Sequence, residues 1–188
     1  MSWLLVTGFG PFPGVPRNPT ADLIEALARD RWPGVRFFVL PTHFALEDEL
    51  RAAAGASDRV LMFGVSGRAR QLRYERVSRP GGSVVPDQAG ARSGGPWRSR
   101  RTAFDVTALA AAARGAGFPV VPSDDAGRYV CNASYGIALS ANPQSLFVHV
   151  PPTTRYGALS GDGLVRHATW LIGALGGAQP QPGVRRGW

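Results

Sequence analysis

The sequence predicts an α/β protein, a three-layer α/β/α sandwich with a mostly parallel, twisted sheet. Short apolar runs alternate along the chain with stretches of helical composition, and such alternation is typical of a sheet covered by helices on both faces. The apolar runs are continuous, as in strands that are buried on both sides. The length of 188 residues suits one domain. We expect a single α/β domain over residues 1–175 and a flexible tail over 176–188.

The elements follow one another at short intervals. Residues 3–6 form the first apolar run, and a loop rich in glycine and proline leads from Gly8 to an amphipathic stretch over 21–30, which Asn18 or Thr20 would cap. Further strands are expected at 35–40, 60–63, 72–78, 118–121 and 146–150, and further helices at 46–54, 103–116, 161–175 and from about 131 onwards. Residues 79–101 show little periodicity, so no element is assigned there.

Arginine rather than lysine carries the positive charge of the chain. The formal net charge is +8, and arginines gather over residues 92–101 and at 185–186. Such runs can bind nucleic acid or an acidic partner, but no aromatic and basic platform accompanies them. We therefore interpret them as solvated loop and tail arginines and expect no nucleic-acid partner.

Hydropathy and cysteine content exclude several classes of protein. No segment has the roughly 18 uncharged apolar residues that a membrane helix needs, and the first residues lack the basic flank of a signal peptide. We therefore expect a cytoplasmic protein without membrane contact. The single cysteine, Cys131, excludes an internal disulfide and a multi-cysteine zinc site. We expect no metal and no cofactor.

Ligands of open α/β sheets gather at the carboxyl ends of the strands. The loop after the first strand carries two phenylalanines, and the third strand runs into 64–67. The strand over 118–121 leads towards Cys131, and His149 lies near the end of the last strand. We expect these four segments to meet at one edge of the sheet.

Cys131 follows a polar turn and enters a predicted helix. A thiol near the first turn of a helix is exposed to the positive end of the helix dipole, and the free amides there favour the thiolate. A lone cysteine is also often a small buried hydrophobic residue. Cys131 is thus a candidate nucleophile, with a core residue as the alternative.

A cysteine nucleophile needs a base, and imidazole suits this task because its ordinary pKa is about 6.5. His43 follows the second strand and could approach the same edge, whereas His167 lies within the last helix and is most simply a surface or packing residue. His149 interrupts an apolar strand, where a polar ring needs a partner. It is the candidate base, with a buried structural histidine as the alternative.

A third group usually orients such an imidazole. Glu75, within the predicted strand over 72–78, is the acid placed most suggestively for this role. An exposed glutamate beside arginines is the alternative that the residues alone leave open.

Six short motifs, in a fixed order, connect these residues to a known family. They are V-T-G-F-G-P-F at 6–12, N-P-T at 18–20, E-R-V at 75–77, V-P-D at 85–87, A-G-R-Y-V-C-N at 126–132 and F-V-H-V-P at 147–151. They resemble V-T-G-F-x-P-F, N-P-S/T, E-R-V, I-P-D, A-G-T-Y-V-C-N and F-I-H-V-P of the pyroglutamyl peptidase I family, also called pyrrolidone carboxyl peptidases. The motifs span most of residues 3–152.

The resemblance implies a cysteine exopeptidase that removes an N-terminal pyroglutamate (5-oxoproline) from peptides. Cys131 would be the nucleophile, His149 the acid and base, and Glu75 the group that holds the ring. Backbone N–H groups near Cys131 are the expected oxyanion donors, since a helix N-terminus presents unpaired amides. The resemblance also implies that residues 1–175 are the catalytic domain, and that the chain forms a homodimer or homotetramer.

The family's pocket implies the residues that bind the flat, mostly apolar lactam ring. The residues assigned to substrate binding are Phe9, Phe12, Val65, Val85, Tyr129 and Val130. The two phenylalanines would enclose the ring between them. Packing beneath their loop is the alternative.

The chain departs from the family beside the predicted site. Where the family has G-Q-A-G-G-R, residues 64–69 read G-V-S-G-R-A, so Val65 replaces the glutamine and Ala69 the arginine. Val84 replaces the arginine before I-P-D, and 78–80 read S-R-P in place of A-I-N. Ser66 and Arg68 are possible replacements for the missing polar contacts. The alternative to a pyroglutamyl peptidase is therefore a silent or respecified homologue that binds a small cyclic amide or a peptide terminus.

Overall fold

Six strands form one mixed sheet in this structure, a computed structural model that describes residues 3–83, 85–93, 98–152, 161–177 and 179–181. The strands are β1 (Leu4–Phe9), β2 (Val35–Leu40), β3 (Arg59–Val65), β4 (Leu72–Glu75), β5 (Val77–Ser78), β6 (Arg100–Arg101), β7 (Val120–Ser123) and β8 (Ser145–Val150). The helices are α1 (Pro19–Leu27), the 3₁₀ helix η1 (Phe44–Leu46), α2 (Glu47–Gly55), α3 (Val106–Gly115), α4 (Val130–Ala141) and α5 (Gly161–Ala174).

The main sheet has the order β2-β1-β3-β8-β4-β7. Neighbours from β2 to β8 are parallel, whereas β4 is antiparallel to β8 and β7 is parallel to β4. The predicted mostly parallel sheet is confirmed. The expectation that β7 ends at the same edge as β1, β3 and β8 is wrong, because β7 runs in the opposite direction. The loop over 124–129 returns the chain to that edge before α4 begins.

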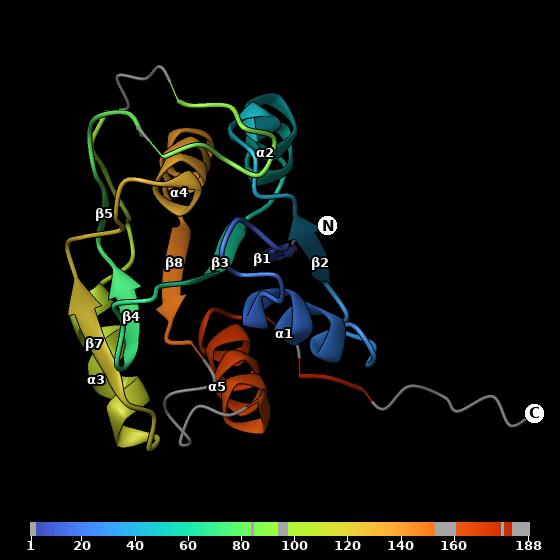
Figure 1. Cartoon of the computed structure of the whole chain (residues 1–188). Helices are drawn as coiled ribbons and strands as arrows, with labels where there is room; N and C mark the ends of the chain where they lie inside the picture. Colours follow the sequence, from blue (N-terminus) through green and yellow to red (C-terminus); the bar gives the residue numbers. More distant parts are fainter. Residues whose placement is uncertain (1–2, 84, 94–97, 153–160, 178, 182–188) are drawn as a thin grey trace, which may run out of the picture.

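Helices cover both faces of the sheet, which confirms the three-layer α/β/α fold (Figure 1). On one face, α2 and α4 cover a core that includes Leu5, Phe9 and Phe147. On the other face, α1, α3 and α5 cover a larger core that includes Leu61 and Val148. Adjacent residues of β8 alternate between the two cores, as a strand buried on both sides requires.

The turn from β1 to α1 is built as the sequence predicts. The side-chain oxygen of Asn18 accepts a hydrogen bond from the N–H of Thr20 (3.0 Å), and its amide donates to the carbonyl of Gly10 (2.9 Å). A Cβ on Gly8 would lie 2.3 Å from the carbonyl oxygen of Thr20. Glycine is therefore required here, because α1 packs closely on the backbone of β1.

The predicted strand over 72–78 is two strands. The N–H of Arg76 donates to the carbonyl of Ser123 (2.7 Å), and its own carbonyl accepts from Thr102 (3.0 Å). The chain leaves the main sheet at this residue, and β5 then pairs with β6. The strand β6 lies within residues 79–101, where no element was expected.

The start of the expected tail contacts the domain. Gln181 exchanges two backbone hydrogen bonds with Arg31, of 2.8 and 3.1 Å. Residues 178 and 182–188 lie outside the described part of the chain. Within the described part, no helix has the length and apolar character needed to cross a bilayer.

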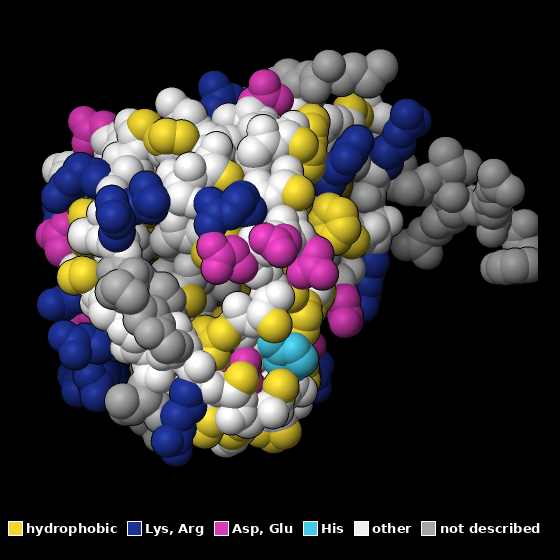
Figure 2. All heavy atoms as spheres, turned by 90° about the horizontal axis from the view of Figure 1, so that it is seen from above, with side chains coloured by type: hydrophobic (Ala, Val, Ile, Leu, Met, Phe, Trp, Pro, Cys, Tyr) yellow, Lys and Arg dark blue, Asp and Glu magenta, His cyan; other side chains and the backbone are white. Residues whose placement is uncertain are grey.

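The arginines on the face over α2 and α4 form several separate groups, with acidic side chains between them (Figure 2). The first turn of α2 carries three exposed acids, Glu47, Asp48 and Glu49. This face therefore presents mixed charge rather than one continuous basic field.

Candidate active site

The site begins with a row of residues across the edge of the sheet. Gly64 of β3 is in register with His149 of β8, which is in register with Arg73 of β4. Phe9, the last residue of β1, belongs to the core on the α4 face. The ring of His149 lies 4.8 Å from that of Phe147, two residues earlier on the same strand face. The row thus lies on the face that α4 covers.

Cys131, the second residue of α4, lies directly over Gly64. A Cβ on Gly64 would be 2.9 Å from the sulfur of Cys131 and 2.7 Å from Cζ of Phe147. The absence of a side chain at Gly64 leaves room for the thiol beside His149. Cys131 and His149 line the same cavity.

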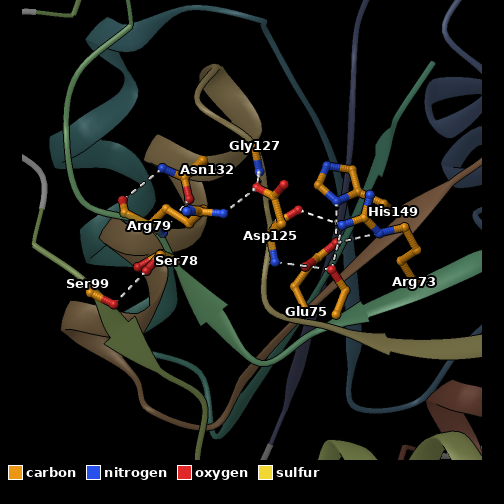
Figure 3. Close-up of polar contacts among 10 residues, drawn as sticks. Arg73, Glu75, Ser78, Arg79, Ser99, Asp125, Gly127, Asn132 and His149 are labelled. Atoms are coloured by element: carbon orange, nitrogen blue, oxygen red, sulfur yellow. Dashed lines mark hydrogen bonds and ion pairs between the residues drawn. The ribbon is translucent and has the colours of Figure 1, made fainter. Parts of the chain in front are cut away.

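His149 and Glu75 form a buried pair (Figure 3). Nδ1 of His149 lies 2.8 Å from Oε1 of Glu75, whose side chain is completely buried. Nε of Arg73 lies 3.5 Å from the same oxygen. Oε2 of Glu75 has no hydrogen-bond partner among the described residues. The glutamate is therefore not exposed, and its one direct hydrogen bond holds the histidine.

The position of Cys131 does not make it a thiolate at rest. Burial raises the pKa of the Cys131 thiol to about 12, and the negative charge of Glu75 acts in the same direction. The backbone N–H of Cys131 itself acts in the opposite direction but is outweighed. The amide at the helix N-terminus thus favours the thiolate as expected, but desolvation is the larger effect and the pKa of Cys131 is raised overall.

A cavity of about 650 Å³ opens above this row. Five of the residues assigned to substrate binding stand on its wall, and they are Phe9, Phe12, Val65, Val85 and Tyr129. Val130 does not. Its side chain is fully buried in the core beneath α4, because the first turn of the helix points this position towards the sheet. The assignment of the Val130 side chain to the pocket is therefore corrected.

Tyr129 is fixed in the wall by rings and by a hydrogen bond. Its ring centroid lies 6.0 Å from that of Phe12 and 5.9 Å from that of Phe44, and its hydroxyl donates to the carbonyl of Pro86 (3.1 Å). The loop that carries Pro86 is held by Asp87. The wall is thus supported from behind, as a preformed pocket needs.

Asp87 organises this loop through its backbone contacts. Its carboxylate accepts hydrogen bonds from the N–H groups of Phe44, Ala89 and Ala91, each 2.8–2.9 Å long. Burial acts to raise the pKa of Asp87, but these three donors outweigh it and the pKa lies below its usual range. The V-P-D motif therefore has a structural role here.

Polar residues that the sequence did not single out also line the cavity. Nη2 of Arg73 donates to Oγ of Ser123 (2.5 Å) and to the carbonyl of Asp125 (2.8 Å), while Nη1 of Arg79 lies 3.3 Å from the Asp125 carboxylate. Figure 3 shows the two arginines approaching Asp125 from opposite sides. A sequence signal existed for Arg73, since it stands two residues before Glu75 and so shares its strand face. No local signal pointed to Arg79.

Asn132, next to the cysteine, holds the backbone of Arg79. Its side-chain oxygen accepts from the N–H of Arg79 (2.7 Å), and its amide donates to the carbonyl of the same residue (3.0 Å). This pair of hydrogen bonds ties the segment after β5 to the first turn of α4 (Figure 3). Asn132 thus places Arg79 at the cavity.

The other histidines lie away from the cavity wall. His43 precedes η1 and does not line the cavity, although its neighbour Thr42 does. Nε2 of His167 lies 2.7 Å from the hydroxyl of Tyr74, and the ring is completely buried. Of the two expectations for His167, packing is therefore correct and a surface position is not.

The positions that depart from the family motif lie where the sequence indicates. Val65 stands on the cavity wall together with Ser66 and Arg68, whereas Ala69 is buried. Val84 lies outside the described residues. In the described part of the chain, no three His, Cys, Asp or Glu side chains are grouped so that they could hold a metal ion.

A cysteine and a histidine at one cavity of an α/β/α fold, with a buried glutamate bound to the histidine, are typical of the cysteine hydrolases. Comparison with known proteins narrows this class. The model of the family described as pyroglutamyl peptidase matches residues 2–154. The chain belongs to the pyroglutamyl peptidase family.

Individual relatives agree with this family. A pyrrolidone-carboxylate peptidase of Clavibacter michiganensis subsp. michiganensis is 33% identical over 173 residues, which cover 82% of this chain and 80% of the relative. The crystal structure of pyrrolidone carboxyl peptidase from Thermus thermophilus is similar with a TM-score of 0.72 and 26% identity, over 88% of this chain and 96% of that one. The pyrrolidone carboxyl peptidase from Thermococcus litoralis, at 22% identity and a TM-score of 0.76, covers 89% of this chain and 90% of its own and supports the fold.

Proposed function

We propose that this protein is a cysteine peptidase that hydrolyses the amide bond after an N-terminal pyroglutamate. The observation that carries the proposal is the buried hydrogen bond between Glu75 and His149, next to Cys131 on one cavity, in a chain of the pyroglutamyl peptidase family. A catalytic histidine needs a hydrogen-bond acceptor that orients its ring, as Glu75 does here. A histidine with a purely structural role would not need to share a cavity with the cysteine.

Glu75 sets the proton positions on the ring. An ionised carboxylate can only accept hydrogen bonds, so Nδ1 of His149 carries the proton and Nε2 is left as the acceptor. Since the pKa of Cys131 is raised to about 12, its thiol is protonated at neutral pH. His149 therefore takes the proton as the sulfur attacks, and Glu75 stabilises the charged ring that forms.

The reaction then proceeds in two halves. The sulfur of Cys131 bonds to the carbonyl carbon of pyroglutamate, and the amide bond breaks as His149 returns its proton to the departing amine. Water, deprotonated by His149, then cleaves the thioester and releases pyroglutamate with the thiol restored. Tyr129 makes no side-chain cap on α4, so the N–H groups of its first turn are the proposed donors to the oxyanion.

The apolar part of the cavity is the proposed lactam site. Phe12 and Tyr129 offer ring faces and edges that a flat five-membered ring can contact, while Phe9, only 1% exposed, backs the wall from the core. Val85 is 55% exposed and lines the same cavity, so a bound ligand could cover its side chain.

One observation favours a second candidate, a respecified or silent homologue that binds a cyclic amide or a peptide terminus. Val65 stands on the wall in place of the family's glutamine, so a side-chain amide is missing there. A site built to hydrogen-bond its ligand loses much of its selectivity when such a group is removed. Ser66 and Arg68, on the same wall, are the proposed replacements.

We further propose that the enzyme acts in the cytoplasm as a homodimer or homotetramer. The single free cysteine is compatible with a reducing compartment. The mass of the purified protein by light scattering tests the oligomeric state.

The test of the proposed function is the release of a fluorophore from a pyroglutamyl amide under reducing conditions. We expect turnover by the wild-type protein and its loss in Cys131→Ala. A control is Thr169→Ala on α5, a position that does not line the cavity. Tight binding of 2-pyrrolidone without any turnover would instead identify a silent binding protein.

A further inference from the structure

The cavity carries more positive charge than a neutral lactam requires. Four arginines line it, and they are Arg68, Arg73, Arg79 and Arg128. Asp125 is the one carboxylate among the described lining residues. The wall therefore has an excess of positive charge, which raises the local concentration of anions and stabilises a bound one.

Two of these arginines are already paired. Arg73 is bound to Ser123 and to the carbonyl of Asp125, and Arg79 is paired with the Asp125 carboxylate. This environment leaves Asp125 ionised: burial acts to raise its pKa, but the N–H of Gly127 and the charges of Arg79 and Arg73 lower it below the usual range. The one carboxylate of the described wall is thus paired with an arginine of the same wall.

Arg68 and Arg128, unlike Arg73 and Arg79, have no partner among the described residues. Both side chains are exposed, and neither makes an ion pair or hydrogen bond with another residue in the part of the chain described. They come from separate segments, the loop after β3 and the loop before α4. Two free cations at one cavity are available to a ligand.

The arginines come from both sides of His149. Arg73 lies on β4 and Arg128 in the loop over 124–129, whereas Arg68 follows β3 on the other side of β8. The departing amine must lie near His149, which donates its proton. The residue that follows pyroglutamate therefore begins at a strand that lies between the segments carrying Arg68 and Arg128.

Two of the four arginines also depart from the family motifs. Arg128 stands where A-G-T-Y-V-C-N has a threonine, and Arg79 stands where A-I-N has an isoleucine. Neither position needs a charge to hold Cys131 or His149. Ala69 and Val84 stand where the family motifs have arginines, so this chain places its arginines at other positions than the family does.

We propose that this cavity selects pyroglutamyl peptides whose second residue carries a carboxylate, which Arg68 and Arg128 bind. The proposal rests on the proposed function. The carboxylate has two possible sources, the side chain of an acidic second residue and the free carboxyl terminus of a dipeptide. A carboxylate that accepts from guanidinium groups forms short, charge-assisted hydrogen bonds.

Three peptides separate these sources. They are pyroglutamyl-glutamine amide, which is neutral, pyroglutamyl-glutamate amide, which has only a side-chain carboxylate, and pyroglutamyl-glutamine with a free carboxyl terminus. We expect kcat/KM for at least one charged peptide to exceed that for the neutral peptide by about 10-fold at low ionic strength, mainly through KM. The ratio should fall to about 2- to 3-fold in 0.5 M NaCl, because salt screens exposed charges.

Arginine variants test the assignment. In the double variant Arg68→Gln/Arg128→Thr, the preference for the charged peptide should fall to about 1- to 2-fold. The matched control is Arg29→Thr/Arg70→Gln, which removes the same charge from exposed arginines outside the cavity and should keep the preference. Circular dichroism verifies that both variants are folded.

The outcomes separate this proposal from the proposed function. If the neutral peptide is cleaved and neither charged peptide is cleaved faster, the anion preference is wrong while the peptidase stands. A preference that the control variant loses equally would also overturn it, since net charge rather than these two residues would then be the cause. If none of the three peptides is cleaved, the proposed function itself fails.

Discussion

His149 connects the buried and the open parts of the site. One ring nitrogen is bound to a glutamate that is completely buried, and the ring also lines the cavity with Cys131. The sequence alone indicated Cys131, His149 and Glu75 as a group, because each stands in a distinctive motif. It could not supply the pKa of Cys131, since burial depends on what packs over α4 and not on the local sequence.

Replacing Glu75 by glutamine tests the positioning role of this residue. The amide can still contact Nδ1, but it cannot stabilise a charged ring, so we expect kcat to fall by about 10- to 1000-fold with KM changed by less than about 3-fold. Steady-state kinetics on a pyroglutamyl amide measure both constants. Glu25→Gln on the exposed face of α1 is the matched control. A rise in KM with kcat unchanged would instead indicate a role in substrate binding.

The elements were predictable where the apolar runs are long, and less so at their ends. The strands β1, β3 and β8 were expected near their observed positions because they are continuous apolar runs, and α5 because its buried residues recur every three to four positions. The break at Arg76 and the direction of β7 depend on backbone hydrogen bonds to Thr102 and Ser123. Such long-range partners leave no periodic signal in the sequence.

Gly64 shows how an element constrains the site. In Gly64→Ala the new Cβ would meet both the sulfur of Cys131 and the ring of Phe147, at 2.9 and 2.7 Å. We expect kcat/KM to fall by about 100-fold, because a displacement of about 1 Å misaligns the nucleophile, and the protein to lose about 1–3 kcal/mol of stability. Kinetics and urea unfolding measure the two effects.

The control for this variant is Gly115→Ala, at the end of α3, where an added Cβ meets nothing within 4 Å. It should leave kcat/KM unchanged. If Gly64→Ala kept wild-type kinetics, the position of the Cys131 thiol would not depend on the space above Gly64.

At the scale of the whole molecule, the two cores have different chemistry. The core beneath α2 and α4 ends at the site, whereas the larger core beneath α1, α3 and α5 contains the buried pair of Tyr74 and His167. The sequence predicted the layers, because strands that alternate with helices leave few other arrangements. It did not predict the cluster of arginines at the cavity, since the loops that carry Arg68 and Arg128 come together with Arg73 of β4 only in the folded chain.

His167 makes the stability of the molecule depend on pH. Burial lowers the pKa of His167 to about 3, whereas an unfolded histidine titrates near 6.5. Between about pH 6.5 and pH 3 the imidazole binds a proton in the unfolded chain but not in the folded protein. The stability that His167 contributes is therefore fully present above about pH 6.5 and is lost as the pH falls towards 3. The expected loss from this residue is of the order of a few kcal/mol.

Urea unfolding between pH 7 and pH 4 measures this loss. In His167→Gln, which does not titrate, the free energy of unfolding should fall less over the same range than in the wild type. Equal slopes for His167→Gln and the wild type would contradict the assignment.

The central claim is that Cys131 carries the pyroglutamyl group during turnover. The most direct measurement is the mass of the enzyme after rapid mixing with a pyroglutamyl amide and quenching in acid, followed by digestion. We expect one added pyroglutamyl group on the peptide that contains Cys131, and none in Cys131→Ala. Release of pyroglutamate by the wild type with no acyl group on Cys131, or equal turnover by Cys131→Ala, would contradict it.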